Sequence, residues 1–193
     1  MKNTLLVCFF ISSFTFWPNN VLAQFDINAL NAISSSPEFL QGQFVQQKYL
    51  NDFDVSLEST GEFDYLQGQV VHWHTLSPIQ NLVTMTPSSI VSHQDDVEVM
   101  SLQAESNPVV TLLSEVFFSV LTSEWQKLEN YFELSGEIDQ QTWSVSLTPK
   151  DTALAQAISH VELKGDIYLR YLKFYESNGD YTEIQFDHLR QHK

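Results

Sequence analysis

Residues 39–91 constrain the fold of this chain most, because their apolar positions recur at every second residue. Within residues 55–65, apolar or small residues alternate with serine, glutamate, threonine and aspartate, which is typical of a strand buried on one face. Leu66-Gln67-Gly68-Gln69 then provides a turn into the next apolar run, so the two strands form a hairpin. The pattern predicts a continuous series of antiparallel strands.

The C-terminal part of the chain returns to the same pattern. Trp143, Val145 and Leu147 alternate with polar residues, and three further runs are separated by turns that contain glycine. Together the segments predict about eight to ten antiparallel strands, a number that curls into a barrel or a strongly bent sheet. Besides 55–65, the main expected strands are 70–76, 79–86, 88–93, 143–147, 158–164, 166–176 and 180–189.

One long segment is apolar on nearly every face of a helix. Pro108–Leu121 reads PVVTLLSEVFFSVL, and a proline suits the first helical turn. A helix that is apolar all round is buried or covers something apolar. The expected fold class is α+β, mainly antiparallel β, with this helix against the concave face of the barrel or bent sheet. Shorter helices are expected at residues 26–36 and 152–156.

The first residues have the features of an export signal. Lys2 gives a short positive region, residues 5–16 are largely apolar, and Ala23 stands where a small residue precedes a cleavage site. We expect residues 1–23 to be a signal peptide and residues 24–193 to form a single domain. The apolar run is too short to span a membrane, and no later segment reaches spanning length.

The charge of the chain excludes several classes of partner. The formal net charge is −15, so nucleic-acid binding, which needs a basic patch, is not expected. Docking on an anionic lipid surface is also disfavoured. An acidic surface suits solubility and steering towards basic partners, and an acidic proteome explains the same charge equally well. The sole cysteine, Cys8, lies inside the expected signal, so the rest of the chain has no thiol or disulfide chemistry.

Four motifs resemble one known family. Phe44-x-Gln46 comes first, residues 59–63 (STGEF) follow, and Trp73-x-x-x-x-Pro78 comes third. This order resembles the N-terminal half of the LolA-like periplasmic outer-membrane lipoprotein carriers. Residues 143–150 (WSVSLTPK) are similar to a later strand of the same family.

The resemblance implies both a fold and a function. The fold would be an incomplete antiparallel barrel with a helical lid over an apolar cavity. The function would be to carry the acyl chains of a lipoprotein or glycolipid across the periplasm of a Gram-negative bacterium, without catalysis and without a cofactor. The implied partners are the acylated cargo, an inner-membrane donor complex and an outer-membrane acceptor, with the chain acting as a monomer. Well-studied members have a lid-latching arginine in the turn that here reads Gln67-Gly68.

The resemblance also assigns roles to individual side chains. The same residues would serve a filled barrel core with a permanently docked helix, so the pattern alone leaves both interpretations open. The expected cavity lining is Phe44, Leu57, Phe63, Trp73 and Trp143, and the expected lid residues are Leu113, Phe117, Phe118 and Leu121.

Candidate metal sites are weak. His72 and His74 lie two residues apart, which places both imidazoles on one face of a strand, a spacing that can bind metal. No carboxylate has a reason to join them, so we expect both to face solvent and predict no metal site. Asp95, Asp96 and Glu98 lack the alternating ligands and central glycine of a calcium loop, which favours a solvated turn.

Two further functions are open from the sequence. One is a secreted binding module for a small apolar ligand, similar in use to a lipocalin, which a defined ligand volume would identify. The other is a lipid-acting hydrolase, in which replacing a carboxylate such as Asp95 abolishes turnover while binding persists. The chain has no G-x-S-x-G, H-E-x-x-H, P-loop or dinucleotide motif, so catalysis is not expected.

Overall fold

The computed structural model describes residues 25–35, 37–103, 108–150 and 152–191, without the side chains of 108–113 and 153. The expected signal peptide therefore lies outside the described residues. The strands are β1 (Phe39–Leu50), β2 (Val55–Leu66), β3 (Val70–Ser77), β4 (Asn81–Thr86), β5 (Ser89–Gln94), β6 (Val97–Gln103), β7 (Phe132–Asp139), β8 (Thr142–Pro149), β9 (Ile158–Gly165), β10 (Leu169–Glu176) and β11 (Tyr181–Arg190). The helices are α1 (Ile27–Ile33), α2 (Pro108–Leu121), α3 (Trp125–Leu128) and α4 (Thr152–Ala157), with a short 3-10 helix, η1 (Asn51–Phe53), between β1 and β2.

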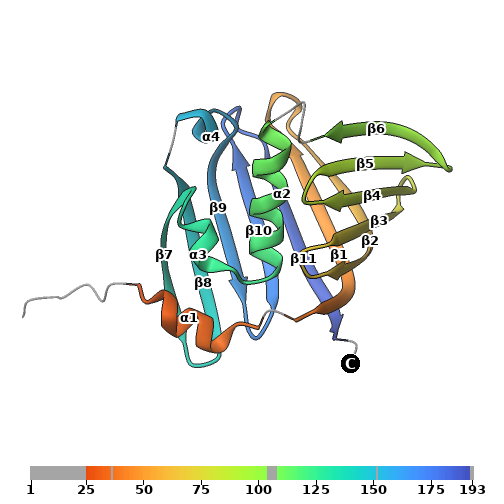
Figure 1. Cartoon of the computed structure of the whole chain (residues 1–193). Helices are drawn as coiled ribbons and strands as arrows, with labels where there is room; N and C mark the ends of the chain where they lie inside the picture. The colour runs from red at the N-terminus through yellow and green to blue at the C-terminus, as the bar shows by residue number, and fades with distance from the viewer. Residues whose placement is uncertain (1–24, 36, 104–107, 151, 192–193) are drawn as a thin grey trace, which may run out of the picture.

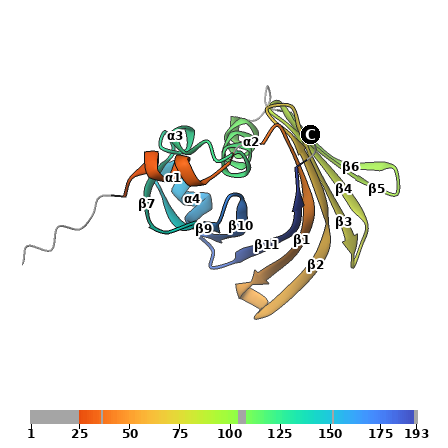
Figure 2. The ribbon, with the colours of Figure 1, turned by 90° about the horizontal axis from the view of Figure 1, so that it is seen from below.

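The described strands form one antiparallel sheet that does not close. Its order is β6-β5-β4-β3-β2-β1-β11-β10-β9-β8-β7, so the sheet begins at β6 and ends at β7. The sheet curls around the helices, and α2 lies inside the curve (Figures 1 and 2). The predicted α+β class and half-open architecture are confirmed, and the estimate of about eight to ten strands is too low, since the sheet has eleven.

The sequence pattern missed the two edge strands, β6 and β7. In β6, Val99 and Met100 are consecutive apolar residues, so the strand lacks the alternation of a half-buried strand. In β7 the alternation is present, but Gly136 stands at an inward position in the middle of the run and weakens the signal. The first helix ends at Ile33 rather than at residue 36, because Ser34 is already extended.

The inner face of the sheet carries the core. Phe44 of β1 lies opposite Gly61 of β2, and Phe63 of β2 lies opposite Trp73 of β3. A Cβ atom on Gly61 would stand 2.1 Å from the carbonyl oxygen of His74 and 2.7 Å from Cζ of Phe44. The glycine is therefore required because the Phe44 ring and the neighbouring backbone occupy the space of a side chain.

The helices cover the inner face in two groups. α1 packs on α3, and α4 packs on β8 and β9, so these short helices lie over one half of the sheet. α2 contacts α3 and β5 and therefore bridges to the other half (Figure 2). Within the described residues, no helix has the length and apolar character needed to cross a membrane.

Candidate functional site

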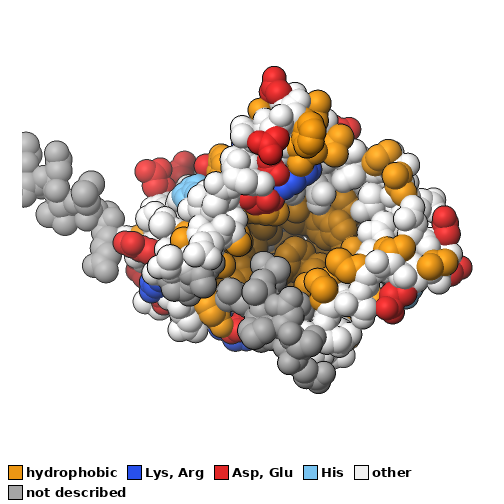
Figure 3. Space-filling view, turned by 90° about the horizontal axis from the view of Figure 1, so that it is seen from above, with side chains coloured by type: hydrophobic (Ala, Val, Ile, Leu, Met, Phe, Trp, Pro, Cys, Tyr) orange, Lys and Arg blue, Asp and Glu red, His pale blue; other side chains and the backbone are white. Residues whose placement is uncertain are grey.

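The most prominent surface feature is an apolar hollow. Seen from above, the molecule is hollowed in its middle, and hydrophobic side chains line the hollow (Figure 3). Acidic side chains and a basic one lie together at one part of its rim in this view. An apolar hollow with a polar rim is the general form of a site for an apolar ligand.

An aromatic cluster joins the sheet to α2. The Phe44 and Trp73 rings stack with centroids 3.8 Å apart, and Phe63 lies 6.0 Å from Trp73. Phe186 of β11 meets Phe63 and Trp73 edge-on, at 5.4 and 6.1 Å. Phe117 of α2 packs edge-on against Trp73 at 6.2 Å. The structure thus brings Phe44, Phe63 and Trp73, three of the expected cavity residues, into one buried cluster.

The other two predicted lining residues lie elsewhere. Trp143 is buried under α3, where it meets Trp125 edge-on at 5.0 Å and donates a hydrogen bond from Nε1 to the Asp166 carbonyl oxygen. It belongs to a filled part of the core rather than to the aromatic cluster. Leu57 lies on the inner face, since it alternates with Gly61 and Phe63, but its side chain is 56% exposed. The Leu57 side chain therefore projects from the inner face without packing closely against other side chains.

The predicted lid residues form part of α2. Phe118 and Leu121 are buried, Phe117 is half-buried, and the side chain of Leu113 lies outside the described residues. In this structure α2 packs against the sheet, where Phe117 contacts Trp73. The hydroxyls of Ser114 and Thr122 are buried and have no hydrogen-bond partner among the described residues. Each such hydroxyl costs about 1–3 kcal/mol while it stays buried, which lowers the stability of the docked position.

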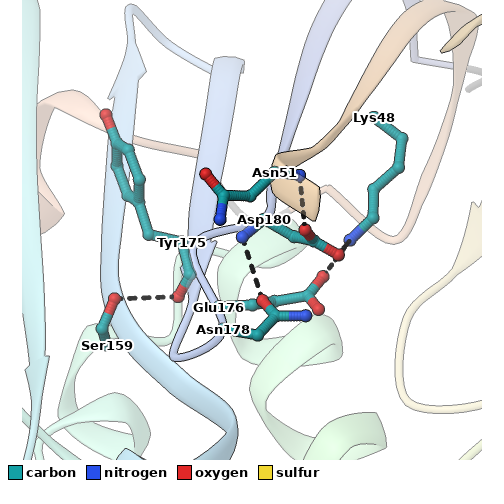
Figure 4. A network of polar contacts seen from close by, with 7 residues as sticks. All are labelled: Lys48, Asn51, Ser159, Tyr175, Glu176, Asn178 and Asp180. Carbon is teal, nitrogen blue, oxygen red and sulfur yellow. Dashed lines mark hydrogen bonds and ion pairs between the residues drawn. The ribbon is translucent and has the colours of Figure 1, made fainter. Parts of the chain in front are cut away.

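A polar network ties β1 to the β10–β11 turn. Lys48 lies on the inner face beside Leu57, and its ammonium group contacts Glu176 and lies 3.8 Å from Oδ2 of Asp180 (Figure 4). The backbone N–H of Asn51 donates to Oδ1 of Asp180 at 2.8 Å. The network holds the end of β1 and η1 against the turn. Sequence analysis missed Lys48, although the alternation Phe44, Gln46, Lys48 places it on the inner face.

Replacing Asp180 by asparagine is expected to remove an acid-sensitive part of the stability. The Asn51 N–H, with Lys48 nearby, holds the pKa of the Asp180 carboxyl below its ordinary value of 3.8. Because the folded-state pKa is depressed, this stabilisation is present above pH 3.8 and is lost as the pH falls through the folded-state pKa. Urea unfolding over a pH series should show Asp180→Asn less stable than the wild type at neutral pH, with a difference that shrinks in acid. A difference that is constant with pH would contradict this.

The outer face of the sheet carries the two histidines. His72 and His74 lie on one face and are partly exposed, as predicted. The expectation that no carboxylate joins them is wrong, because the β2–β3 register sets Asp64 opposite His72 and Glu62 opposite His74. The Nδ1–carboxylate distances are 2.9 and 3.8 Å. Among the described residues, no group of three or more histidine, cysteine or acidic side chains has the geometry of a metal site.

A polar groove of about 570 Å³ runs along this outer face. Its lining is mixed in charge, so it differs in chemistry from the apolar hollow on the inner face. The main polar lining residues are Gln41, Gln43, Glu62, Asp64, His72, His74, His188 and Arg190.

The predicted acidic turn is confirmed. Asp95 and Asp96 have φ angles of 48° and 62° and join β5 to β6. Two consecutive residues with positive φ are typical of the tight turn of a β-hairpin, and aspartate tolerates this conformation. The turn places three carboxylates, including that of Glu98, at one end of β6.

The chain matches a known protein family over most of its length. The sequence model of the family described as "Outer membrane lipoprotein carrier protein LolA" matches residues 35–193. A search of curated proteins finds no match.

Solved structures give remote likenesses. A LolA superfamily protein from Nitrosomonas europaea is 7% identical, with a TM-score of 0.43, covering 86% of this chain and 92% of its own. An outer membrane lipoprotein-sorting protein domain from Vibrio parahaemolyticus is 11% identical, with a TM-score of 0.43, covering 85% of this chain and 90% of its own. The family match over most of the chain, together with the open sheet and its covering helices, decides the assignment. The chain belongs to the LolA family of outer membrane lipoprotein carriers.

Proposed function

We propose that this chain is a periplasmic carrier that buries the acyl chains of a lipoprotein or glycolipid between its sheet and α2 and shuttles them towards the outer membrane. The observation that supports this most is the apolar hollow of the inner face (Figure 3). An inner-membrane complex would load the cargo and an outer-membrane acceptor would remove it. The chain itself acts by binding and does not catalyse a reaction.

The energetics of acyl burial fit a moving helix. Removing one methylene from water gains about 0.8 kcal/mol, so a single acyl chain supplies enough free energy to displace part of a docked helix. α2 is suited to this, because Phe117 is half-buried and the Ser114 hydroxyl is buried without a partner among the described residues. A helix that returns to the empty hollow competes with the cargo and limits its affinity, which a carrier that must release its cargo requires.

Native mass spectrometry of the protein purified gently from its own periplasm tests the proposal. We expect an acylated species to be bound, and its mass identifies the cargo as lipoprotein or glycolipid. Titration with fatty acids of increasing length should show tolerance of length. Binding of one ligand size only would favour the alternative module for a small apolar ligand. An apo mass that also refuses added lipids and lipopeptides would overturn the carrier proposal.

Leu57→Glu is expected to weaken acyl binding at least tenfold without loss of stability. Leu57 lies on the inner face and is exposed, so the substitution sets a charge beside the hollow and breaks no packing. Loss of one leucine contact corresponds to roughly 1.5–3 kcal/mol, which is at least tenfold in affinity. Titration with a fluorescent fatty acid measures the effect. Ser56→Glu is the matched control, because Ser56 is also exposed and points to the outer face of the same strand. Equal effects of the two variants would contradict the assignment of the inner face.

A further inference from the structure

The two edges of the sheet differ in how well they are protected. β7 alternates buried or half-buried residues with exposed ones, and its exposed positions include Glu133, Glu137 and Asp139. Phe25 covers Gly136, since its Cε2 atom would lie 3.0 Å from a Cβ there. Charges and cover of this kind are how sheet edges avoid pairing with other chains.

β6 is less well protected, with Glu98 as its one charged residue and a single irregularity in its ladder with β5. Val97, Val99 and Met100 are 63%, 55% and 40% exposed. Among the described strands β6 pairs with β5, and the sheet order ends there, so the other side of β6 faces outwards. The β5–β6 turn also projects away from the helices (Figure 2). A strand with an open side and exposed apolar side chains is a template for an added strand.

We propose that β6 binds an extended segment of a partner protein by strand addition, and that this segment alternates apolar residues with lysine or arginine. The apolar positions would pack beside Val97 and Val99, which stand two residues apart. The basic positions would face the carboxylates of Asp95, Asp96 and Glu98 at the turn end of the strand. Strand addition uses the backbone edge of β6, so the proposal does not depend on the proposed carrier function.

The charge favours a basic partner over a second copy of this chain. The formal net charge is −15, so two copies repel each other, whereas a basic segment is attracted. The three acidic residues of the turn end strengthen both effects locally.

The test uses the full mature protein and a short end-capped peptide that alternates lysine and valine. Amide shifts in NMR titrations should be confined to β6 and the β5–β6 turn, and hydrogen exchange should slow in β6. The same peptide with a central proline should not bind, because proline removes a backbone donor. A peptide that alternates glutamate and valine should bind at least tenfold more weakly at low salt.

Variants separate this site from non-specific attraction. The double variant Val97→Lys, Val99→Lys should lower affinity for the basic peptide at least tenfold, while Ile167→Lys, an equally exposed apolar position elsewhere, should leave it unchanged. Asp95→Asn with Asp96→Asn should flatten the salt dependence. Amide shifts that spread over other strands would overturn the proposal. So would equal affinity of the Val97→Lys, Val99→Lys variant and of Ile167→Lys for the basic peptide. Sedimentation that shows a dimer, dissociated by the double variant Val97→Lys, Val99→Lys, would also overturn the proposal. The occupant of β6 would then be a second copy of this chain.

Discussion

Replacement of Trp73 by alanine is expected to lower the free energy of unfolding by about 3–5 kcal/mol, the usual range for deleting a buried large aromatic side chain. The ring is buried and contacts Phe44, Phe63, Phe117 and Phe186, so its loss opens a cavity in the middle of the aromatic cluster. Urea unfolding followed by circular dichroism measures the change.

The Trp73 variant also tests how α2 is held. Because Phe117 packs edge-on against Trp73, hydrogen exchange in the second half of α2 should become faster in the variant. Phe53→Ala is the control, because that side chain is 74% exposed and its loss should change stability by less than about 0.5 kcal/mol. A loss below about 1 kcal/mol for Trp73→Ala would mean that the cluster is not tightly packed.

Gly61→Ala is expected to destabilise the protein by about 3 kcal/mol or more, although it adds a single methyl group. The new Cβ atom would overlap the His74 carbonyl oxygen of the neighbouring strand, which cannot move without disturbing the β2–β3 ladder. It would also overlap the Phe44 ring. Thermal unfolding of the purified variant, or loss of soluble protein, reports the effect.

A second glycine provides the control for Gly61. Gly68 stands in the β2–β3 turn with a φ of 65°, and a Cβ atom there would meet no other atom within 4 Å. Gly68→Asn should cost at most about 1 kcal/mol, because asparagine tolerates the left-handed conformation. If both variants were equally stable, steric overlap at Gly61 would not be the reason for the glycine.

The sequence predicted the elements whose signal is local. The alternation along β2, the turn at Gly68 and the all-round apolarity of Pro108–Leu121 each describe neighbouring residues, and the structure confirms the strand, the turn and the helix. The pairing of His72 with Asp64 was also within reach, since counting outwards from the turn sets these two residues opposite each other.

The parts that the sequence did not predict depend on distant segments. Phe186 joins the aromatic cluster because β11 pairs with β1, and no local periodicity encodes a register between strands so far apart in the chain. Trp143 has the same inward pattern as Trp73, yet it lies in another part of the core, because alternation gives the face of a strand and not its place along the curve of the sheet. β6 was missed for another reason. Nearly all of its side chains are exposed, so no buried face imposes an alternation of apolar and polar residues.

An open sheet also changes what determines the width of the interior. In a closed barrel, the number of strands and their stagger fix the radius, so the lumen cannot widen without breaking hydrogen bonds. Among the described strands, the β3–β6 and β7–β10 ends of the sheet are joined through β2, β1 and β11, and not directly to each other. A change in strand twist spread over this arc would alter the cross-section with every ladder hydrogen bond kept. The side chains and α2 thus set the diameter, and a bulkier occupant can be accommodated by flexing of the arc.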